Sequence, residues 1–323
     1  MTERPIVLIP QDVPEQAKNA LVGLGCAVRM GTGITEDALI ADIGDADFVV
    51  ARTAPYTRRV LEAARRLRCI SRFGVGVDNI DLAAAATFGI WVANTPEANS
   101  ATVAEHALAM MFACAIDLVN ACNETKKGNF NYRNQVMGID LGGKTLSIIG
   151  LGRIGRRLAV IAQALSMRVV AYDPFVPTGQ EPGGVVMVDD YDQAFREADF
   201  LSLHLPLTEN TRGSVGHREF ALMKRSAYFV NCSRGEVVRE ADLIAALESG
   251  EIAGAAIDVF ETEPPSSDNP LFRLPNVVVT PHDASFTHEA FGRMGEHMVH
   301  NIRDVLEGRV PTWPVNRPEA PRA

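Results

Sequence analysis

The sequence predicts an α/β protein made of two doubly wound parallel-sheet domains, and three observations support this fold class. The chain has 323 residues, and because a domain usually has roughly 150 residues, two domains are expected. Short β-branched runs alternate with helical patterns in both halves, which is typical of parallel strands joined by crossover helices. A glycine-rich turn between a strand and a helix opens the second series, as in nucleotide-binding sheets.

The first series of alternating segments begins close to the N-terminus. Its expected strands are residues 6–9, 27–30, 48–50, 69–73 and 90–93, and its expected helices cover residues 14–24 and start again at residue 36. Residues 100–120 then carry apolar side chains at helical spacing, which predicts one long helix. His106 lies on this helix, where a histidine is more often a structural residue than a ligand.

The second series begins at Lys144. Its expected strands are residues 146–149, 168–172, 200–205, 228–232, 255–259 and 277–280, and its helices start at residue 153 and cover 193–198, 219–223 and 241–249. A last amphipathic helix, residues 288–306, is stopped by Gly308 and followed by a WPVN tail. Its apolar stripe needs a preformed surface, so we expect it to pack on the first domain. We expect no regulatory domain after residue 323.

The charge balance restricts the partners of the protein. The formal net charge is −9, whereas nucleic acid and anionic membranes bind basic surfaces that displace counterions. Neither is therefore expected as a partner. A small anionic substrate is still compatible with this charge, because a few arginines can hold it locally.

The cysteines and the N-terminus carry little functional signal. Five cysteines, an odd number without a CxxC pair or a histidine at zinc spacing, indicate buried free thiols and no metal site. The start MTERPIVLIP has too short an apolar run for a signal peptide, and no stretch approaches the roughly 20 apolar residues of a membrane helix. We therefore expect a cytoplasmic protein.

The clearest motif is a dinucleotide loop, SIIGLGRIG, at residues 147–155. Gly150 allows a tight turn, Gly152 lets the backbone approach a pyrophosphate, and Gly155 allows the helix to pack closely on the strand. The phosphates then lie at a helix N-terminus. The glycine spacing alone is a weak signal, but here it follows a β-branched run and precedes a helical pattern.

An acidic residue stands at the spacing that this motif requires. Asp173 ends the run RVVAYD, where a carboxylate binds the adenosine ribose hydroxyls and repels a 2′-phosphate. NAD is therefore expected rather than NADP. Arg153, inside the loop, is a cation that could weaken this preference.

Three later segments each place a polar residue at the end of an expected strand. They are FVNCSRGEVV with Arg234, AIDVFETEP with Glu263 and VVVTPHDAS with His282. Because ligands of open α/β sheets bind at the carboxyl ends of the strands, these three side chains are expected to converge on the nicotinamide. They are the predicted catalytic residues.

These segments closely resemble the D-isomer-specific 2-hydroxyacid dehydrogenases. The same holds for RFGVGVDNID, NTPEANSATVAEH and HLPLTENT, so that at least six motifs match in the order of the family. The resemblance implies a Rossmann cofactor domain, residues 99–285, inserted into a flavodoxin-like substrate domain, residues 1–98 and 286–323. It also implies a homodimer formed through the cofactor domains.

The reaction explains why these residue types are needed. Removing a hydride from an alcohol carbon also requires a base for the hydroxyl proton, and a histidine that titrates near neutrality is suited to this task. Glu263 can hold the imidazole of His282 and stabilise its protonated form. Arg234 can bind the carboxylate or keto oxygen of the substrate through its planar fork and stabilise developing negative charge.

The resemblance also implies which residues bind the two ligands. Backbone amides of Gly74, Val75 and Gly76 are expected to hold the substrate carboxylate, and Asp258 to contact the nicotinamide carboxamide. The complete predicted cofactor set is Thr102, Gly150, Gly152, Arg153, Ile154, Gly155, Asp173, His204, Pro206, Thr208, Cys232 and Asp258. Asp283 follows the catalytic histidine, where an apolar or small residue is more usual; its carboxylate could act on His282 or face solvent.

Further residues are candidates for substrate selection. Arg52 and Thr53 match the position of a polar clamp in the family, and Arg72 and Arg133 are two more cations, the latter in a segment that can reach across a dimer. A cluster of arginines suggests a second anionic group on the substrate, such as phosphate or sulfonate. Ordinary surface arginines are an equally good interpretation.

The substrate therefore stays open at this point. The motifs look most like those of 3-phosphoglycerate dehydrogenases, closely followed by hydroxypyruvate or glyoxylate reductases, with sulfolactate-type oxidation as a third possibility. A different class of function is an NAD-sensing corepressor or scaffold, because fold alone does not fix function. The presence of all three catalytic candidates favours an enzyme.

Overall fold

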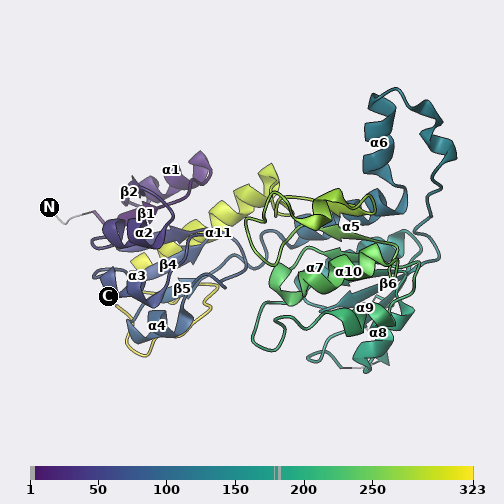
Figure 1. Ribbon diagram of the computed structural model, residues 1–323. Helices are drawn as coiled ribbons and strands as arrows, with labels where there is room; N and C mark the ends of the chain where they lie inside the picture. Colours follow the sequence, from purple (N-terminus) through teal and green to yellow (C-terminus); the bar gives the residue numbers. More distant parts are fainter. Residues whose placement is uncertain (1–3, 178, 181–182, 323) are drawn as a thin grey trace. The chain divides into compact units, whose positions relative to one another are not determined.

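The computed structural model describes residues 4–177, 179–180 and 183–322. The chain forms two compact units, which consist of Met1–Asn99 with Phe286–Ala323 and of Ser100–Ser285 (Figure 1). The first unit therefore contains both ends of the chain, and the second is inserted into it. The first boundary falls after residue 99, one residue later than predicted.

The first unit contains a parallel sheet of five strands in the order β2-β1-β3-β4-β5, which is the flavodoxin-like order. The strands are β1 (Ile6–Ile9), β2 (Ala27–Met30), β3 (Phe48–Ala51), β4 (Cys69–Arg72) and β5 (Trp91–Ala93). The helices are α1 (Glu15–Gly23), α2 (Glu36–Asp42), α3 (Arg58–Ala63), α4 (Leu82–Thr87) and α11 (His288–Leu306). Threonine or aspartate side chains cap four of these helices, at Thr35, Thr57, Asp81 and Thr287.

The two faces of this sheet bury different helices, because neighbouring side chains of a strand point to opposite faces. Val7 and Ile9 of β1 pack with α1 and α11, whereas Leu8 packs with α2, α3 and α4. Met294, Met298 and Ile302 of α11 are buried in the first of these cores. The expected packing of the last helix on the first domain is present.

The second unit contains a sheet of eight strands in the order β13-β12-β11-β10-β6-β7-β9-β8. Every pair is parallel except β8 with β9. The chain order reverses between β6 and β10, which makes this the switch point of a Rossmann-type sheet. The strands are β6 (Thr145–Ile149), β7 (Arg168–Tyr172), β8 (Gly179–Gln180), β9 (Val186–Met187), β10 (Phe200–Leu203), β11 (Tyr228–Asn231), β12 (Gly254–Ile257) and β13 (Val277–Val279).

Helices cover both faces of this second sheet. Buried residues of α5 and α7 form one core with the sheet, and buried residues of α8, α9 and α10 form the other. The helices are α5 (Ser100–Ala115), α6 (Leu118–Lys126), α7 (Arg153–Ala164), α8 (Tyr191–Glu197), α9 (His217–Leu222) and α10 (Glu240–Glu248), with short 3₁₀ helices at Phe130–Asn134, Gly235–Val237 and Pro270–Arg273. The predicted fold class is confirmed. The two short strands β8 and β9 were not predicted.

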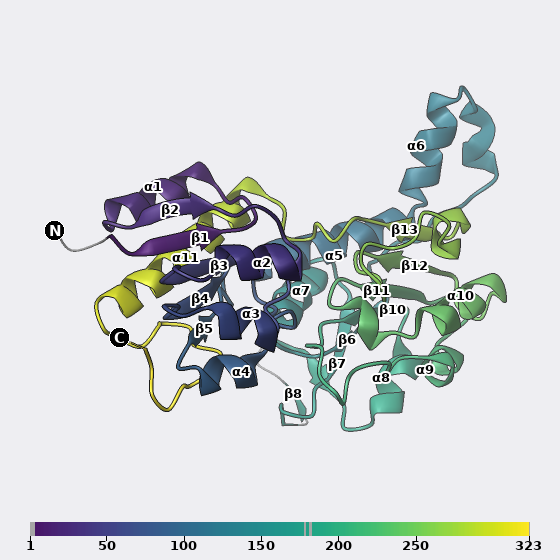
Figure 2. The ribbon, with the colours of Figure 1, turned by 60° about the vertical axis from the view of Figure 1, so that its left-hand side comes forward.

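The prediction of one long helix over residues 100–120 is wrong. The chain breaks after α5 because Asp117 adopts a left-handed conformation, with φ of 49°, which aspartate tolerates better than most residues. Its carboxylate accepts hydrogen bonds from Asn120 Nδ2 (2.7 Å) and Tyr132 Oη (2.6 Å). Helix α6, which follows, buries none of its residues and projects from the rest of its unit (Figures 1 and 2).

Two expectations about the chain as a whole can be compared with the structure. Cys26, Cys69 and Cys232 are buried, but Cys122 is exposed because it lies on α6, so the prediction of buried thiols is wrong for that residue. Among the described residues, no single helix has both the length and the apolar composition to cross a membrane. Helices α5 and α6 reach that threshold only when taken together, and they are bent by 62°.

Candidate functional site

The predicted cofactor and catalytic residues of the second unit gather at one edge of its sheet. Gly150 follows β6, Asp173 follows β7, His204 follows β10, and Asp258 follows β12. Arg234, Glu263 and His282 lie in the loops that follow β11, β12 and β13. Parallel strands bring their carboxyl ends to the same edge, so the loops of six strands contribute side chains to this edge.

The glycine loop has the geometry of a phosphate-binding turn. Gly150 has a φ of 96°, and a Cβ atom there would lie 2.7 Å from the carbonyl oxygen of His204, so only glycine fits. At Gly152, which is the N-cap of α7, a Cβ atom would meet no protein atom within 4 Å. The loop therefore leaves open space beside a helix N-terminus, which is where the backbone binds a pyrophosphate. These residues fit a dinucleotide, and Arg153, Ile154 and Gly155 begin the helix.

Asp173 lies at the end of β7, as predicted, and its carboxylate also holds the glycine loop. Its Oδ2 accepts from the amide of Leu151 and its Oδ1 from the amide of Phe175, both at 2.9 Å. The carboxylate is thus tied to the turn between Gly150 and Gly152. Binding of ribose hydroxyls by the same oxygens stays a prediction.

The remaining predicted cofactor residues differ in their surroundings. Burial lowers the pKa of His204 to about 4, and its Nε2 lies 3.0 Å from Ser202 Oγ. Burial also raises the pKa of the Cys232 thiol, which lies 3.6 Å from Met110 Sδ and is inert at neutral pH. Thr208 lies in an exposed turn closed by Thr211, whereas Thr102 is buried in α5. Pro206 belongs to the same loop as Thr208, and its carbonyl accepts from Thr211 Oγ1.

The structure brings Glu263 and His282 into contact. His282 Nδ1 lies 2.7 Å from Glu263 Oε2, and because an ionised carboxylate can only accept, Nδ1 carries the proton and donates it. Burial raises the pKa of Glu263, but the hydrogen bond from His282, the charges of His282 and Arg234 and the amide of Phe260 outweigh it and hold the pKa below the ordinary value. Glu263 is therefore ionised at neutral pH, and Nε2 of His282 is left to exchange a proton.

A buried carboxylate positions the loop that carries His282. Asp258 accepts hydrogen bonds from Thr280 Oγ1 (2.6 Å) and from the amides of Asp283 (3.0 Å) and Ala284 (3.2 Å). Its own carbonyl accepts from the amide of His282, at 2.8 Å. His282 has a left-handed φ of 54°, a conformation that a non-glycine residue keeps only when its surroundings enforce it. Sequence reasoning identified Asp258 but not this role.

Arg234 is presented by a turn that the sequence analysis missed. Asn231, which is buried at the end of β11, accepts from the amide and hydroxyl of Ser233 and donates to the carbonyl of Arg234. Asparagine after a strand commonly makes such turns, and this was the available signal. Gly235 must be glycine because its Cα faces the backbone of Phe260, in the loop that leads to Glu263.

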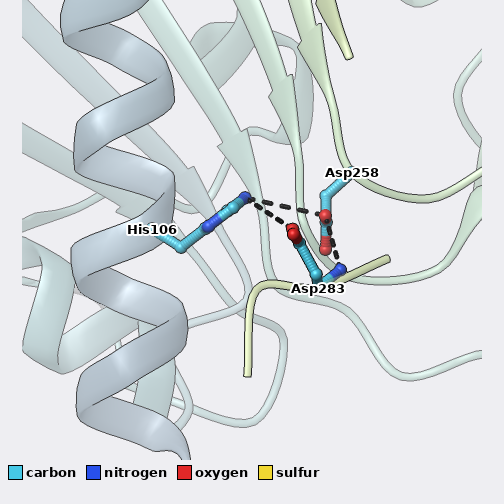
Figure 3. Close-up of side chains that lie close together, drawn as sticks. All are labelled: His106, Asp258 and Asp283. Carbon is cyan, nitrogen blue, oxygen red and sulfur yellow. Dashed lines mark hydrogen bonds and ion pairs between the residues drawn. The ribbon is translucent and has the colours of Figure 1, made fainter. Parts of the chain in front are cut away.

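His106 lies beside two carboxylates (Figure 3). Its Nε2 is 3.6 Å from Asp258 Oδ1, 3.9 Å from Asp283 Oδ1 and 3.2 Å from Thr280 Oγ1. The Asp258 oxygens already accept hydrogen bonds from the loop 280–284. We therefore interpret His106 and the two carboxylates as side chains that support this loop. The Asp283 side chain is 40% exposed and lies close to His106.

In the first unit, the glycine loop after β4 is held by its neighbours. The amide of Gly74 donates to Thr95 Oγ1 at 3.1 Å, and Gly74 has a φ of 139°. Arg72 donates to the carbonyls of Phe73 and Gly76, so its side chain supports the loop. The amides of Val75 and Gly76 have no acceptor within the described parts of the chain. Of the three predicted amides, these two are available to bind an anion.

The other predicted substrate residues are divided between the two units. Arg52 donates to the carbonyl of Asp12 at 2.8 Å and lies 5.7–5.9 Å from the ring centres of Phe73, Phe286 and Phe291. Thr53 is held through both its amide and its hydroxyl by Gln11, which the sequence analysis did not identify. Arg133 belongs to the second unit, where it lies over the ring of Phe130.

Comparison with known proteins identifies the family. Residues 108–284 match the model of the D-isomer specific 2-hydroxyacid dehydrogenase, NAD binding domain. The chain belongs to the D-2-hydroxyacid dehydrogenases. The family resemblance and the NAD cofactor predicted from the sequence are thereby confirmed.

The relatives of this D-2-hydroxyacid dehydrogenase differ in their named substrates. It is 43% identical over 318 residues to a D-3-phosphoglycerate dehydrogenase of Methanocaldococcus jannaschii, with 98% of this chain and 60% of that relative covered. It is 39% identical to a glyoxylate reductase of Korarchaeum cryptofilum, with 88% and 86% covered. A crystal structure of D-lactate dehydrogenase from Aquifex aeolicus complexed with NAD and lactic acid matches with a TM-score of 0.86 and 28% identity, with 97% and 100% covered.

The glycine loop of this D-2-hydroxyacid dehydrogenase yields a test. Gly152→Ala should leave the melting temperature of the free protein unchanged, because the added Cβ meets no protein atom. It should abolish most of the rise in melting temperature caused by NAD, because the backbone can no longer approach the pyrophosphate. Gly150→Ala should instead lower the melting temperature without NAD. Differential scanning fluorimetry of the three proteins measures this, and an unchanged NAD response of Gly152→Ala would contradict the assignment.

Proposed function

We propose that the protein is an NAD-dependent dehydrogenase that interconverts a small D-2-hydroxy acid and its 2-keto acid. The observation that carries this proposal is the 2.7 Å contact between His282 and Glu263 at the edge of the sheet where the dinucleotide loop lies. A hydrogen-bonded imidazole and carboxylate at that edge supply the proton transfer that hydride chemistry requires. The D configuration is part of the proposal and rests on membership of the family.

In the oxidation direction, the substrate carbinol loses a hydride from its carbon and a proton from its hydroxyl group. NAD held at the glycine loop of Gly150 and Gly152 would supply the acceptor for the hydride of the carbinol carbon. His282 Nε2 takes the hydroxyl proton, because Nδ1 is already engaged with Glu263. The carboxylate of Glu263 stabilises the imidazolium that forms, and in the reverse direction His282 returns the proton to the carbonyl oxygen.

Arg234 has the electrophilic role in this proposal. Its charge acts on Glu263, so the guanidinium belongs to the same electrostatic group as the two catalytic partners. The turn built by Asn231 fixes its backbone. A guanidinium there binds the carboxylate or keto oxygen of the substrate and stabilises the negative charge that develops on the oxygen. The amides of Val75 and Gly76 are proposed as donors to the carboxylate of an acid substrate.

A prediction concerns the catalytic pair. His282→Asn should lower kcat by about 10²–10⁴-fold, the usual contribution of a general base, while NAD affinity is retained. Glu263→Gln should lower kcat for keto-acid reduction by at least about tenfold. Glu261→Gln, an exposed residue of the same loop, is the control.

Steady-state kinetics of keto-acid reduction, together with NAD binding by fluorescence, measures both effects. Wild-type turnover in His282→Asn would refute the assignment of the base. An equal loss of kcat in Glu261→Gln and Glu263→Gln would show that the loss is not specific to the contact with His282.

We propose 3-phosphoglycerate as the substrate class to test first. Support comes from the relatives of that name, although the chain spans only 60% of the length of the Methanocaldococcus relative. The Arg52 guanidinium is a candidate for the phosphate, because it is a cation next to Thr53 in the chain and is held in place by the carbonyl of Asp12. Glyoxylate or hydroxypyruvate reduction is the second candidate, because the glyoxylate reductase relative is covered over most of its length.

The two candidates separate in a substrate panel. If the substrate is phosphorylated, Arg52→Ala should raise its KM by about 10–100-fold, the loss of a charged hydrogen bond, and leave glyoxylate kinetics unchanged. Arg133→Ala tests the second arginine in the same assay. Arg58→Ala is a matched control, because Arg58 is another arginine of the first unit that lies over a phenylalanine ring. A higher kcat/KM for glyoxylate than for 3-phosphoglycerate in both wild type and Arg52→Ala would favour the second candidate.

We further propose that the protein is a cytoplasmic homodimer joined through the second unit. The segment of residues 116–137, which contains α6 and the following 3₁₀ helix, exposes apolar side chains, namely Ile116, Leu118, Val119, Phe130 and Met137. Exposed apolar groups on a projecting segment are expected at contacts between subunits. The double variant Leu118→Glu/Val119→Glu should sediment as a monomer and the wild type as a dimer. Val160→Glu, an exposed valine on α7, is the control and should remain dimeric; a wild-type monomer would contradict the proposal.

A further inference from the structure

In the loop after β4, each of the four carbonyl groups from Phe73 to Gly76 accepts a hydrogen bond. The carbonyls of Phe73 and Gly76 accept from Arg72. The carbonyl of Gly74 accepts from the amide of Thr95 at 3.0 Å. The carbonyl of Val75 accepts from Asn94 Nδ2 at 2.7 Å. A planar trans peptide directs its N–H opposite to its C=O, so each carbonyl bond also sets the direction of the next amide.

The bond made by Asn94 therefore fixes a particular donor. Holding the carbonyl of Val75 orients the amide of Gly76, just as holding the carbonyl of Gly74 orients the amide of Val75. These two amides have no acceptor in the described segments. Successive unpaired amides of a turn make a concave site for an anion. Asn94 is the one side-chain amide among the donors to these carbonyls.

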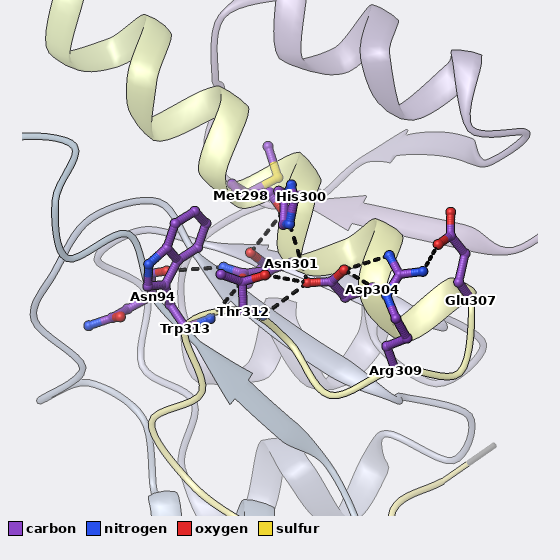
Figure 4. Close-up of polar contacts among 10 residues, drawn as sticks. Asn94, Met298, His300, Asn301, Asp304, Glu307, Arg309, Thr312 and Trp313 are labelled. Atoms are coloured by element: carbon purple, nitrogen blue, oxygen red, sulfur yellow. Dashed lines mark hydrogen bonds and ion pairs between the residues drawn. The ribbon is translucent and has the colours of Figure 1, made fainter.

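Asn94 is itself held by the C-terminal part of the first unit (Figure 4). Its amide donates to the carbonyl of Trp313 at 3.1 Å, and its carbonyl accepts from Asn301 Nδ2 at 3.0 Å. Asn301 is fully buried in α11 and also accepts from the amide of Trp313. The tail that crosses beside β5 thus fixes the backbone of Asn94, and its side chain is left to hold the loop.

The tail is in turn anchored by a buried carboxylate. Asp304 of α11 accepts from the amide and the hydroxyl of Thr312, at 3.0 and 2.7 Å, and from two nitrogens of Arg309. Its side chain is only 5% exposed. Hydrogen bonds therefore link Asp304 to Thr312, the next residue Trp313 to Asn94, and Asn94 to Val75.

We propose that Asn94 is a positioning residue for the substrate, which orients the amide of Gly76 toward the substrate carboxylate and is held in place by the C-terminal tail. This inference rests on the proposed function, because it takes the acid substrate as the anion of the loop. In this proposal Asn94 itself does not contact the substrate. Loss of its side chain should therefore weaken binding of the acid without slowing the chemistry or changing NAD binding.

The test compares two asparagines that flank the same strand. Asn316 donates to the carbonyl of Ile90 at 2.9 Å and accepts from the amide of Val92, so it holds β5 and the tail but not the loop. Asn94→Ala should raise the KM for the acid about tenfold, with less than about a threefold change in kcat and an unchanged KM for the cofactor. Asn316→Ala should leave all three constants within about twofold. Asn94→Asp keeps the shape, removes the donor and serves if Asn94→Ala does not fold.

A binding measurement separates failure of this inference from failure of the proposed function. The dissociation constant of malonate, an unreactive dicarboxylate, is measured by calorimetry in the presence of NADH and should rise about tenfold in Asn94→Ala alone. If wild type binds malonate without turning over any acid, the proposed reaction fails while the rise in the dissociation constant still supports the role of Asn94. Equal constants for Asn94→Ala and Asn316→Ala would overturn the inference, as would a wild type that binds neither malonate nor substrate.

Discussion

The geometry of the proposed catalytic edge depends on the buried carboxylate of Asp258. A carboxylate without solvent is costly unless its oxygens accept hydrogen bonds, and here the bonds come from the loop 280–284. The hydrogen bonds that compensate the buried charge of Asp258 are therefore the same bonds that fix the conformation of the loop. His282 can keep its left-handed backbone because the amides after it are bound to Asp258 and its own amide to the carbonyl of that residue.

The same arrangement recurs along the edge of the sheet. Asp173 binds the dinucleotide turn, and Asn231 binds the turn that presents Arg234. In each case a short polar side chain at a strand end holds the backbone of a loop, and the loop carries a residue that we propose as a ligand contact. The sheet underneath is rigid and apolar, so the loops can differ between relatives without loss of the core. This is consistent with the different substrate names among the relatives.

Much of this could be predicted from the sequence, because the signals are local. The dinucleotide turn needs glycine at fixed spacing, and Arg234, Glu263 and His282 each follow an apolar run that ends at the sheet edge. The break of the long helix was not predictable, because the apolar pattern continues through residues 116–119 and only the conformation of Asp117 interrupts it. The partners of Asn94, Gln11 and Thr95 were also missed. They depend on contacts between residues 19 or more positions apart, which leave no periodic pattern in the sequence.

The central claim is that this edge transfers a hydride from an acid substrate, and isotope transfer tests it most directly. The protein is incubated with NAD and 3-phospho-D-glycerate or another D-2-hydroxy acid that carries deuterium at C2, and the reduced cofactor is analysed by mass spectrometry. The account predicts one deuterium in NADH from a D acid and none from its L isomer. NAD binding without transfer of deuterium from any D-2-hydroxy acid would contradict it, and would indicate a protein that binds the cofactor without using it.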